Sequence, residues 1–109
     1  MVTSIFEMIG KQKPCFKITL DTNLTSNEVT SLRNIIEQNI DSNYDDIFID
    51  AKDVKNVDLS GINEIINAHY VLEKASKKLH FIFTKNSEIE KWVDNTSLHK
   101  FVTIGIIPE

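Results

Sequence analysis

The residues best suited to chemistry in this sequence are an aspartate, a serine and a glycine near the middle of the chain. Asp58, Ser60 and Gly61 lie in the run 57–62, Val-Asp-Leu-Ser-Gly-Ile. An apolar segment typical of a strand precedes this run, and an amphipathic segment typical of a helix follows it. Such residues at that junction favour a helix start. The Ser60 hydroxyl then lies where backbone amides and the helix dipole favour negative charge, so it could be a cap or a switch.

The elements that must position this turn follow from hydrophobic spacing. Alternating apolar residues predict strands, and apolar residues at helical spacing predict helices. Thr25 and Glu28 form a capping box at the start of the first helix, and Ser87 can cap the last helix. The predicted strands are 3–9, 15–20, 46–51, 79–83 and 101–106, with a turn at 10–14 and helices at 26–40, 61–76 and 88–94.

This order predicts an α/β fold. Strands that alternate with helices imply right-handed crossovers and a mixed, mostly parallel sheet. The first two strands are separated by a short Gly/Pro turn, which predicts an N-terminal hairpin. The chain is too short to cover both faces of the sheet, so we expect the helices mainly on one face. With 109 residues, 41% of them hydrophobic and 26% charged, we expect one globular domain over 1–109.

Composition also argues against several classes of function. The net charge of −4 argues against nucleic-acid binding, which needs a basic surface. We find no signal peptide and no run of about 18 apolar residues, so we expect a cytoplasmic protein without direct membrane insertion. The single cysteine, Cys15, fits a small buried side chain, and no Cys/His cluster has zinc spacing. We therefore expect no metal site and no cofactor.

An enzyme is the weakest interpretation of the sequence. His69, His80 and His99 are scattered and lack a paired nucleophile, so we expect no catalytic residues. His69 falls on the apolar stripe of its helix and fits a partly buried core residue. Trp92 fits the core better than a stacking platform.

The element order and the central turn together resemble the STAS domain of the anti-sigma factor antagonist family. In that family, a strand and an Asp-containing segment lead to the pattern Val-x-x-hydrophobic-Asp-Ser-Ser-Gly-hydrophobic. Here Ile-Phe-Ile-Asp-Ala at 47–51 is followed by the matching run 54–62. Leu59 stands where the family has its first serine, and the family's Gly-x-Leu-Asp reads Thr-Asn-Leu-Thr at 22–25. The resemblance also implies a C-terminal helix, for which this chain leaves room only for a short one or none.

The resemblance implies that Ser60 is the phosphate acceptor of a regulatory interaction domain. The partner would be an anti-sigma factor or a serine kinase of the histidine-kinase-like ATPase type, and phosphorylation would release it. The partner-binding residues that the resemblance and the turn indicate are Asn23, Thr25, Asp58, Leu59, Ser60 and Gly61. Gly61 would leave the approach to Ser60 open for a kinase or a close-packed partner.

Two alternatives stay open on the sequence. Ser60 could merely cap the helix while Asp58 is solvated in the loop. Asp58 could also cap the helix itself, or it could help to position a metal-bound nucleotide in the kinase. The domain could also be a STAS-type accessory subunit of a phospholipid-trafficking ABC transporter, which would bind the ATPase without a phospho-switch.

Overall fold

The computed structural model describes residues 2–7 and 14–108. Seven strands, three α-helices and one 3-10 helix follow one another in these segments. In chain order they are β1 Val2–Glu7, β2 Pro14–Thr19, β3 Asn23–Leu24, α1 Ser26–Gln38, β4 Asp46–Asp50, β5 Asn56–Val57, α2 Leu59–Lys74, β6 Lys78–Thr84, α3 Glu88–Thr96, η1 Leu98–Lys100 and β7 Thr103–Ile107.

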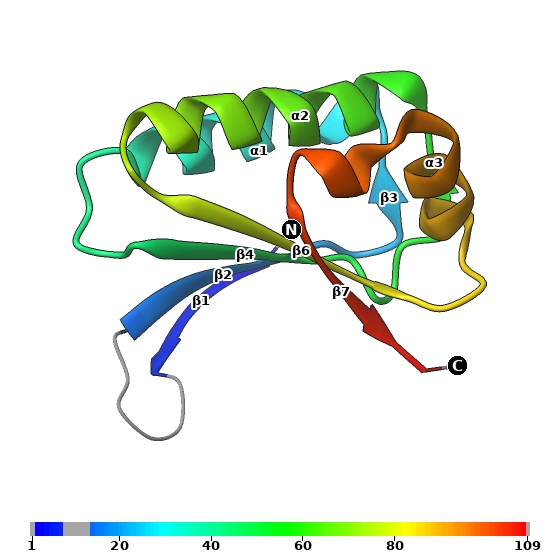
Figure 1. Ribbon diagram of the computed structural model, residues 1–109, viewed down its shortest axis with the longest axis horizontal. Helices are drawn as coiled ribbons and strands as arrows, with labels where there is room; N and C mark the ends of the chain where they lie inside the picture. The colour runs from blue at the N-terminus through cyan, green and yellow to red at the C-terminus, as the bar shows by residue number, and fades with distance from the viewer. Residues whose placement is uncertain (1, 8–13, 109) are drawn as a thin grey trace.

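The main sheet has the strand order β1-β2-β4-β6-β7. β1 pairs with β2 in antiparallel fashion, and every other neighbouring pair is parallel. The predicted mixed sheet and the predicted pairing of the first two strands are confirmed. Residues 8–9 of the predicted first strand and residues 10–13 of the predicted turn lie outside the described segments. Figure 1 shows α1, α2 and α3 on the same side of the sheet, as predicted.

The core lies between the sheet and this helical layer. Successive side chains of a strand point to opposite faces, and the burial pattern follows that alternation. Ile47 and Ile49 of β4 and Phe81 and Phe83 of β6 are buried, and the buried residues of the helices complete the same cluster. Leu72 of α2, for example, is fully buried within it.

Three features of the architecture differ from the sequence prediction. β3 and β5 form a separate two-stranded parallel sheet that periodicity did not reveal. The second helix begins at Leu59 rather than at residue 61, because Asp58 takes the cap position. The 3-10 helix η1 occupies 98–100, so the last strand begins at Thr103 rather than at residue 101.

The opposite face of the sheet carries a different set of contacts. Phe48 stacks on His80 with ring centroids 4.3 Å apart and an interplanar angle of 9°. His80 Nε2 lies 2.8 Å from Asp46 Oδ1. At one edge of the sheet, β7 exposes Ile106 by 53%. No helix in the described part of the chain is long and apolar enough to cross a membrane.

Candidate functional site

The candidate site is built on the short parallel ribbon of β3 and β5. Asn23 and Leu24 pair with Asn56 and Val57, and the Asn56 side-chain amide donates to Asn23 Oδ1 at 2.8 Å. β3 leads through one residue into α1, and β5 leads through one residue into α2. Because the two strands are paired and parallel, the ribbon brings the N-termini of both helices close together.

Asp58 links the two helix starts through a single carboxylate. Its Oδ1 accepts from the Gly61 amide in α2 at 2.9 Å. Its Oδ2 accepts from the Ser26 amide in α1 at 3.1 Å. Asp58 is therefore the N-cap of α2, and the interpretation in which Ser60 caps that helix is wrong.

Thr25 is the N-cap of α1 and forms the predicted capping box with Glu28. Its backbone amide and its hydroxyl donate to Glu28 Oε1 at 2.9 and 2.8 Å. The Asn27 amide donates in return to Thr25 Oγ1 at 3.4 Å. The Thr25 side chain is thus hydrogen-bonded within its own helix start and half-buried.

Gly61 is buried against β3 and does not lie on the surface. A Cβ at this position would lie 2.1 Å from the Leu24 carbonyl oxygen and 2.9 Å from Leu24 Cγ. The glycine therefore allows α2 to approach the ribbon closely. The missing side chain of Gly61 therefore faces the protein interior and does not open the approach to Ser60. Partner binding at Gly61 stays a prediction.

Leu59 and Ser60 are the exposed residues of the first turn of α2. Leu59 is 57% exposed, which is high for a large apolar side chain. Asn23, Thr25 and Asp58 lie half-buried around them. We call these five residues the turn surface; it joins a hydroxyl, an apolar side chain and a rigid, hydrogen-bonded frame.

Ser60 also lines a hollow between α1 and α2 of about 350 Å³, together with Arg33 and Glu64. Arg33 Nη2 lies 2.7 Å from Glu64 Oε1, and Glu64 is only 2% exposed. The hydrogen bond from Glu64 raises the pKa of Arg33 above its usual value. This ion pair was not predicted, although Glu64 lies three residues after Gly61 and four before Ala68 on the buried stripe of α2.

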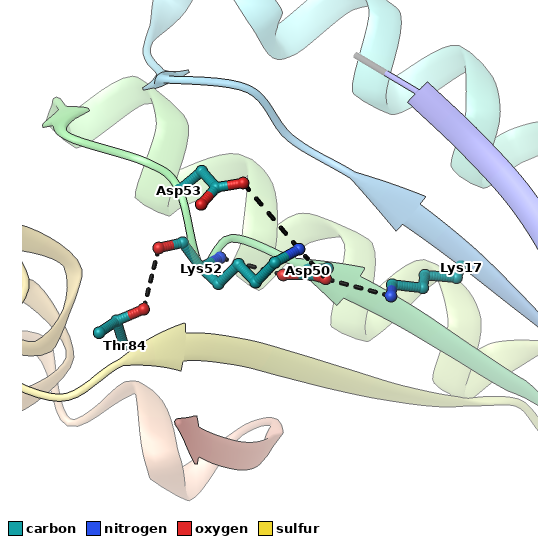
Figure 2. A network of polar contacts seen from close by, with 5 residues as sticks. All are labelled: Lys17, Asp50, Lys52, Asp53 and Thr84. Carbon is teal, nitrogen blue, oxygen red and sulfur yellow. Dashed lines mark hydrogen bonds and ion pairs between the residues drawn. The ribbon is translucent and has the colours of Figure 1, made fainter. Parts of the chain in front are cut away.

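A second ionic network holds the loop that leads from β4 to the turn (Figure 2). The Asp50 carboxylate at the end of β4 accepts from the backbone amide of Lys52 at 3.0 Å. The ammonium groups of Lys52 and Lys17 lie 3.1 and 3.2 Å from Asp50 Oδ2. The Thr84 hydroxyl of β6 donates to the Lys52 carbonyl at 2.9 Å, so the loop is attached to three strands.

Asp50 remains charged in this network despite its burial. Desolvation by burial would raise its pKa, but hydrogen bonds from the Lys52 amide, the Lys52 ammonium and Lys17 outweigh that effect. The pKa of Asp50 is therefore below its usual value. In the sequence, Asp50 is recognisable only as part of the motif at 47–51, and its burial was not predicted.

The remaining candidate residues do not form a reactive cluster. His69 is half-buried, lies 3.6 Å from Glu73 and packs its ring near Phe101. His99 is exposed, and Cys15 is buried as predicted; burial raises its thiol pKa. Within residues 2–7 and 14–108, no group of three or more His, Cys, Asp or Glu side chains could hold a metal ion.

Comparison with known proteins shows the fold. No protein-family model matches the chain, and neither does any curated protein sequence. The NMR structure of the protein TM1081 superposes with a TM-score of 0.66 at 17% identity and covers 83% of this chain and 72% of its own. A DUF3478-family protein from Shewanella loihica PV-4, described as having a SpoIIAA-like fold, gives 0.59 at 11% identity over 96% and 85% of the two chains.

The third similar structure is the anti-sigma factor antagonist SpoIIAA in its unphosphorylated form. It superposes with a TM-score of 0.57 at 15% identity and covers 97% of this chain and 87% of its own. The fold of this chain is therefore SpoIIAA-like, as the resemblance to STAS domains predicted.

Proposed function

We propose that this domain is a STAS-type regulatory module that binds a protein partner through the turn surface. The observation that carries the proposal is the exposure of Leu59 beside Ser60 on the first turn of α2. An exposed leucine next to a hydrogen-bonded frame offers apolar contact area with little conformational freedom to lose on binding. The partner that fits the SpoIIAA-like fold is an anti-sigma factor or a related histidine-kinase-like ATPase in the cytoplasm.

Phosphorylation of Ser60 would act on binding rather than on folding. A phosphoserine carries a charge of about −1.5 to −2, and helix N-termini tolerate negative charge. The first turn of α2 contains no acidic residue after its cap. Arg33 lines the same hollow as Ser60 and would face the new charge. We therefore infer that the domain stays folded while the phosphate excludes a partner that packs on Leu59.

The test starts with affinity capture from the source cell, followed by mass spectrometry of the partners and of Ser60. The purified partner is then titrated against wild type, Ser60→Ala and Ser60→Asp. We expect Ser60→Ala to bind like the wild type and Ser60→Asp to lose binding, with circular dichroism unchanged for both. Equal affinity of Ser60→Asp and Ser60→Ala would refute the switch.

The apolar character of Leu59 favours one alternative partner. In the family pattern this position carries a hydroxyl, so its replacement fits a surface used for contact without phosphate chemistry. Under this interpretation the domain is an accessory subunit of a phospholipid-trafficking ABC transporter and binds its ATPase. Capture of such an ATPase, with Ser60 unmodified in every sample, would support this alternative, and Leu59→Ala would then weaken binding while Ser60→Asp would have less effect.

We propose a binding module rather than an enzyme. Of the two hydroxyls in the turn surface, that of Thr25 is held by Glu28 in the capping box. The Ser60 hydroxyl has no paired base there, because the Asp58 carboxylate already accepts from two backbone amides. Turnover that persists through purification to homogeneity and is lost in Ser60→Ala would contradict this part of the proposal.

A further inference from the structure

The strand β7 forms an open edge of the main sheet. It is the last strand in the order β1-β2-β4-β6-β7, and among the described strands it pairs only with β6. Figure 1 shows β7 at the outside of the sheet, beside β6. One side of its backbone therefore bonds to β6, while the other side is turned away from the sheet.

The hydrogen bonds to β6 indicate which backbone groups of β7 point outward. The Lys85 amide donates to the Ile107 carbonyl at 2.8 Å, so Ile107 faces β6. Because the residues that bond to one neighbour alternate along a strand, Gly105 faces β6 as well. The amides and carbonyls of Ile104 and Ile106 then point away from the sheet. Within the described residues these four groups have no hydrogen-bond partner.

Ile104 and Ile106 also bring apolar side chains to this edge. Their neighbours in the register of β6, Phe81 and Phe83, are buried in the core. Since neighbouring residues of adjacent strands point to the same face, both isoleucines lie on the helical side of the sheet. Ile104 packs partly against the core, whereas Ile106 is 53% exposed. The edge thus presents an apolar side chain beside open hydrogen-bonding groups.

β7 lacks the features that usually protect an edge strand. Proteins discourage pairing at an edge with charged residues, with proline or with a very short strand. β7 has five residues, Thr-Ile-Gly-Ile-Ile, and none of them is charged or a proline. The chain as a whole has a net charge of −4, but two copies that meet along β7 bring no like charges directly opposite each other.

We propose that β7 pairs in antiparallel fashion with β7 of a second copy of this chain, about a twofold axis at Gly105. In this register Ile104 lies opposite Ile106 of the second copy, and the two residues exchange both backbone hydrogen bonds. The axis repeats this pair, so every outward group of the two isoleucines finds a partner. Directly opposite side chains share a face, so the isoleucines of both copies form one cluster that covers Ile106.

Self-complementarity is the reason why a second copy fits this edge. A strand of another protein would have to supply its own apolar residues at matching positions, whereas Ile104 and Ile106 match each other by symmetry. An axis at either isoleucine would place the other one opposite a residue outside β7. The edge contains no residue of the turn surface, so this pairing does not depend on partner binding there or on phosphorylation of Ser60.

Sedimentation of the full chain as a function of concentration tests the pairing. Two five-residue strands bury less surface than the roughly 1,200–2,000 Å² of a stable interface, so we expect a weak dimer with a Kd on the order of 100 µM. Ile106→Lys should weaken it at least about tenfold, because each dimer would bury two ammonium groups. Circular dichroism at the lowest concentration should be unchanged, since Ile106 is exposed in the monomer. Leu59→Lys is the matched control, because Leu59 is similarly exposed, at 57%, but lies outside β7.

Cysteine cross-linking tests the register. Gly105→Cys places a thiol beside the twofold axis, and its Cβ would meet only Ile82 Cγ1, at 3.4 Å. We expect oxidised glutathione to convert this variant to a disulfide-linked dimer on a non-reducing gel. Thr103→Cys is the control, because its two copies would lie about 14 Å apart, too far for a disulfide. The native Cys15 is buried in both variants.

Three results would overturn the proposal. The first is a chain that stays monomeric at about 1 mM, tenfold above the expected Kd; the edge would then be left to a strand of another protein. The second is a Leu59→Lys variant that weakens the dimer as much as Ile106→Lys. The third is cross-linking of Thr103→Cys as fast as that of Gly105→Cys.

Discussion

Replacing Gly61 with alanine tests whether the close contact between α2 and β3 supports the turn surface. In an ordinary helix interior, Gly→Ala stabilises a protein by about 1 kcal/mol. Here the new Cβ would lie 2.1 Å from the Leu24 carbonyl oxygen. The ribbon or the helix would have to retreat by about 0.9 Å to restore the 3.0 Å that real Cβ atoms keep. We therefore expect the sign of the usual effect to be reversed.

The size of the effect follows from what has to move. The Leu24 carbonyl also accepts from the Asp58 amide at 3.3 Å, and Leu24 itself is fully buried. Displacing it strains the core and disturbs the Asp58 cap, which together should cost about 2–3 kcal/mol. For a domain of this size, that loss corresponds to a decrease in Tm of about 10–20 °C.

Urea and thermal unfolding, followed by circular dichroism and by the fluorescence of Trp92, measure this change in the free energy of unfolding. Gly105→Ala is the matched control, because its Cβ would meet only Ile82 Cγ1, at 3.4 Å. We expect the control to stay within about 0.5 kcal/mol of wild type. A Gly61→Ala variant as stable as wild type, or more stable, would refute the reasoning.

Three other predictions concern the capping carboxylate of Asp58 and the ion-paired side chains of Asp50 and Arg33. Asp58→Ala should lower the free energy of unfolding, measured in urea, by about 1–2 kcal/mol, because it removes a helix cap. A variant as stable as wild type would contradict the cap that Asp58 provides to both helices. Asp50→Asn should destabilise the domain by about 1–2 kcal/mol at neutral pH. The pKa of Asp50 is lowered in the folded state. The stability difference between wild type and Asp50→Asn is therefore fully present above about pH 4 and is lost as the pH falls through the folded pKa. A stability difference that does not depend on pH would contradict this prediction. Arg33→Ala should lower the urea concentration at the unfolding midpoint, since Glu64 is left buried without its cation. Arg33→Ala combined with Glu64→Gln should recover part of that loss.

The main elements of the fold could be predicted because their signals are local. The alternation of Ile47 and Ile49 and of Phe81 and Phe83 marks the strands. The capping box of Thr25 marks the start of α1 to the residue. The order of these elements then restricts the sheet, because crossovers between parallel strands are right-handed.

The details of the site could not be predicted because they depend on tertiary contacts. β3 and β5 have two residues each, and a pair of that length has no periodicity to detect. Asp50 and Glu64 look like ordinary solvated carboxylates in the sequence, and only the folded chain shows their burial. Gly61 carried a usable signal, since a glycine within a helical pattern often marks a close approach of backbone, but it was interpreted as an opening to solvent.

The shared carboxylate of Asp58 has a consequence for the thermodynamics of recognition. It joins residues 32 positions apart in the chain, so the turn surface has its shape only while α1 and α2 are both docked. A partner that recognises this shape binds the folded state and not a state that has lost either helix. Binding and folding are then linked, and a partner present at 100 times its Kd would stabilise the domain by about 2.7 kcal/mol. An increase in the melting temperature of the domain can therefore reveal partner binding even when no catalytic or spectroscopic signal exists.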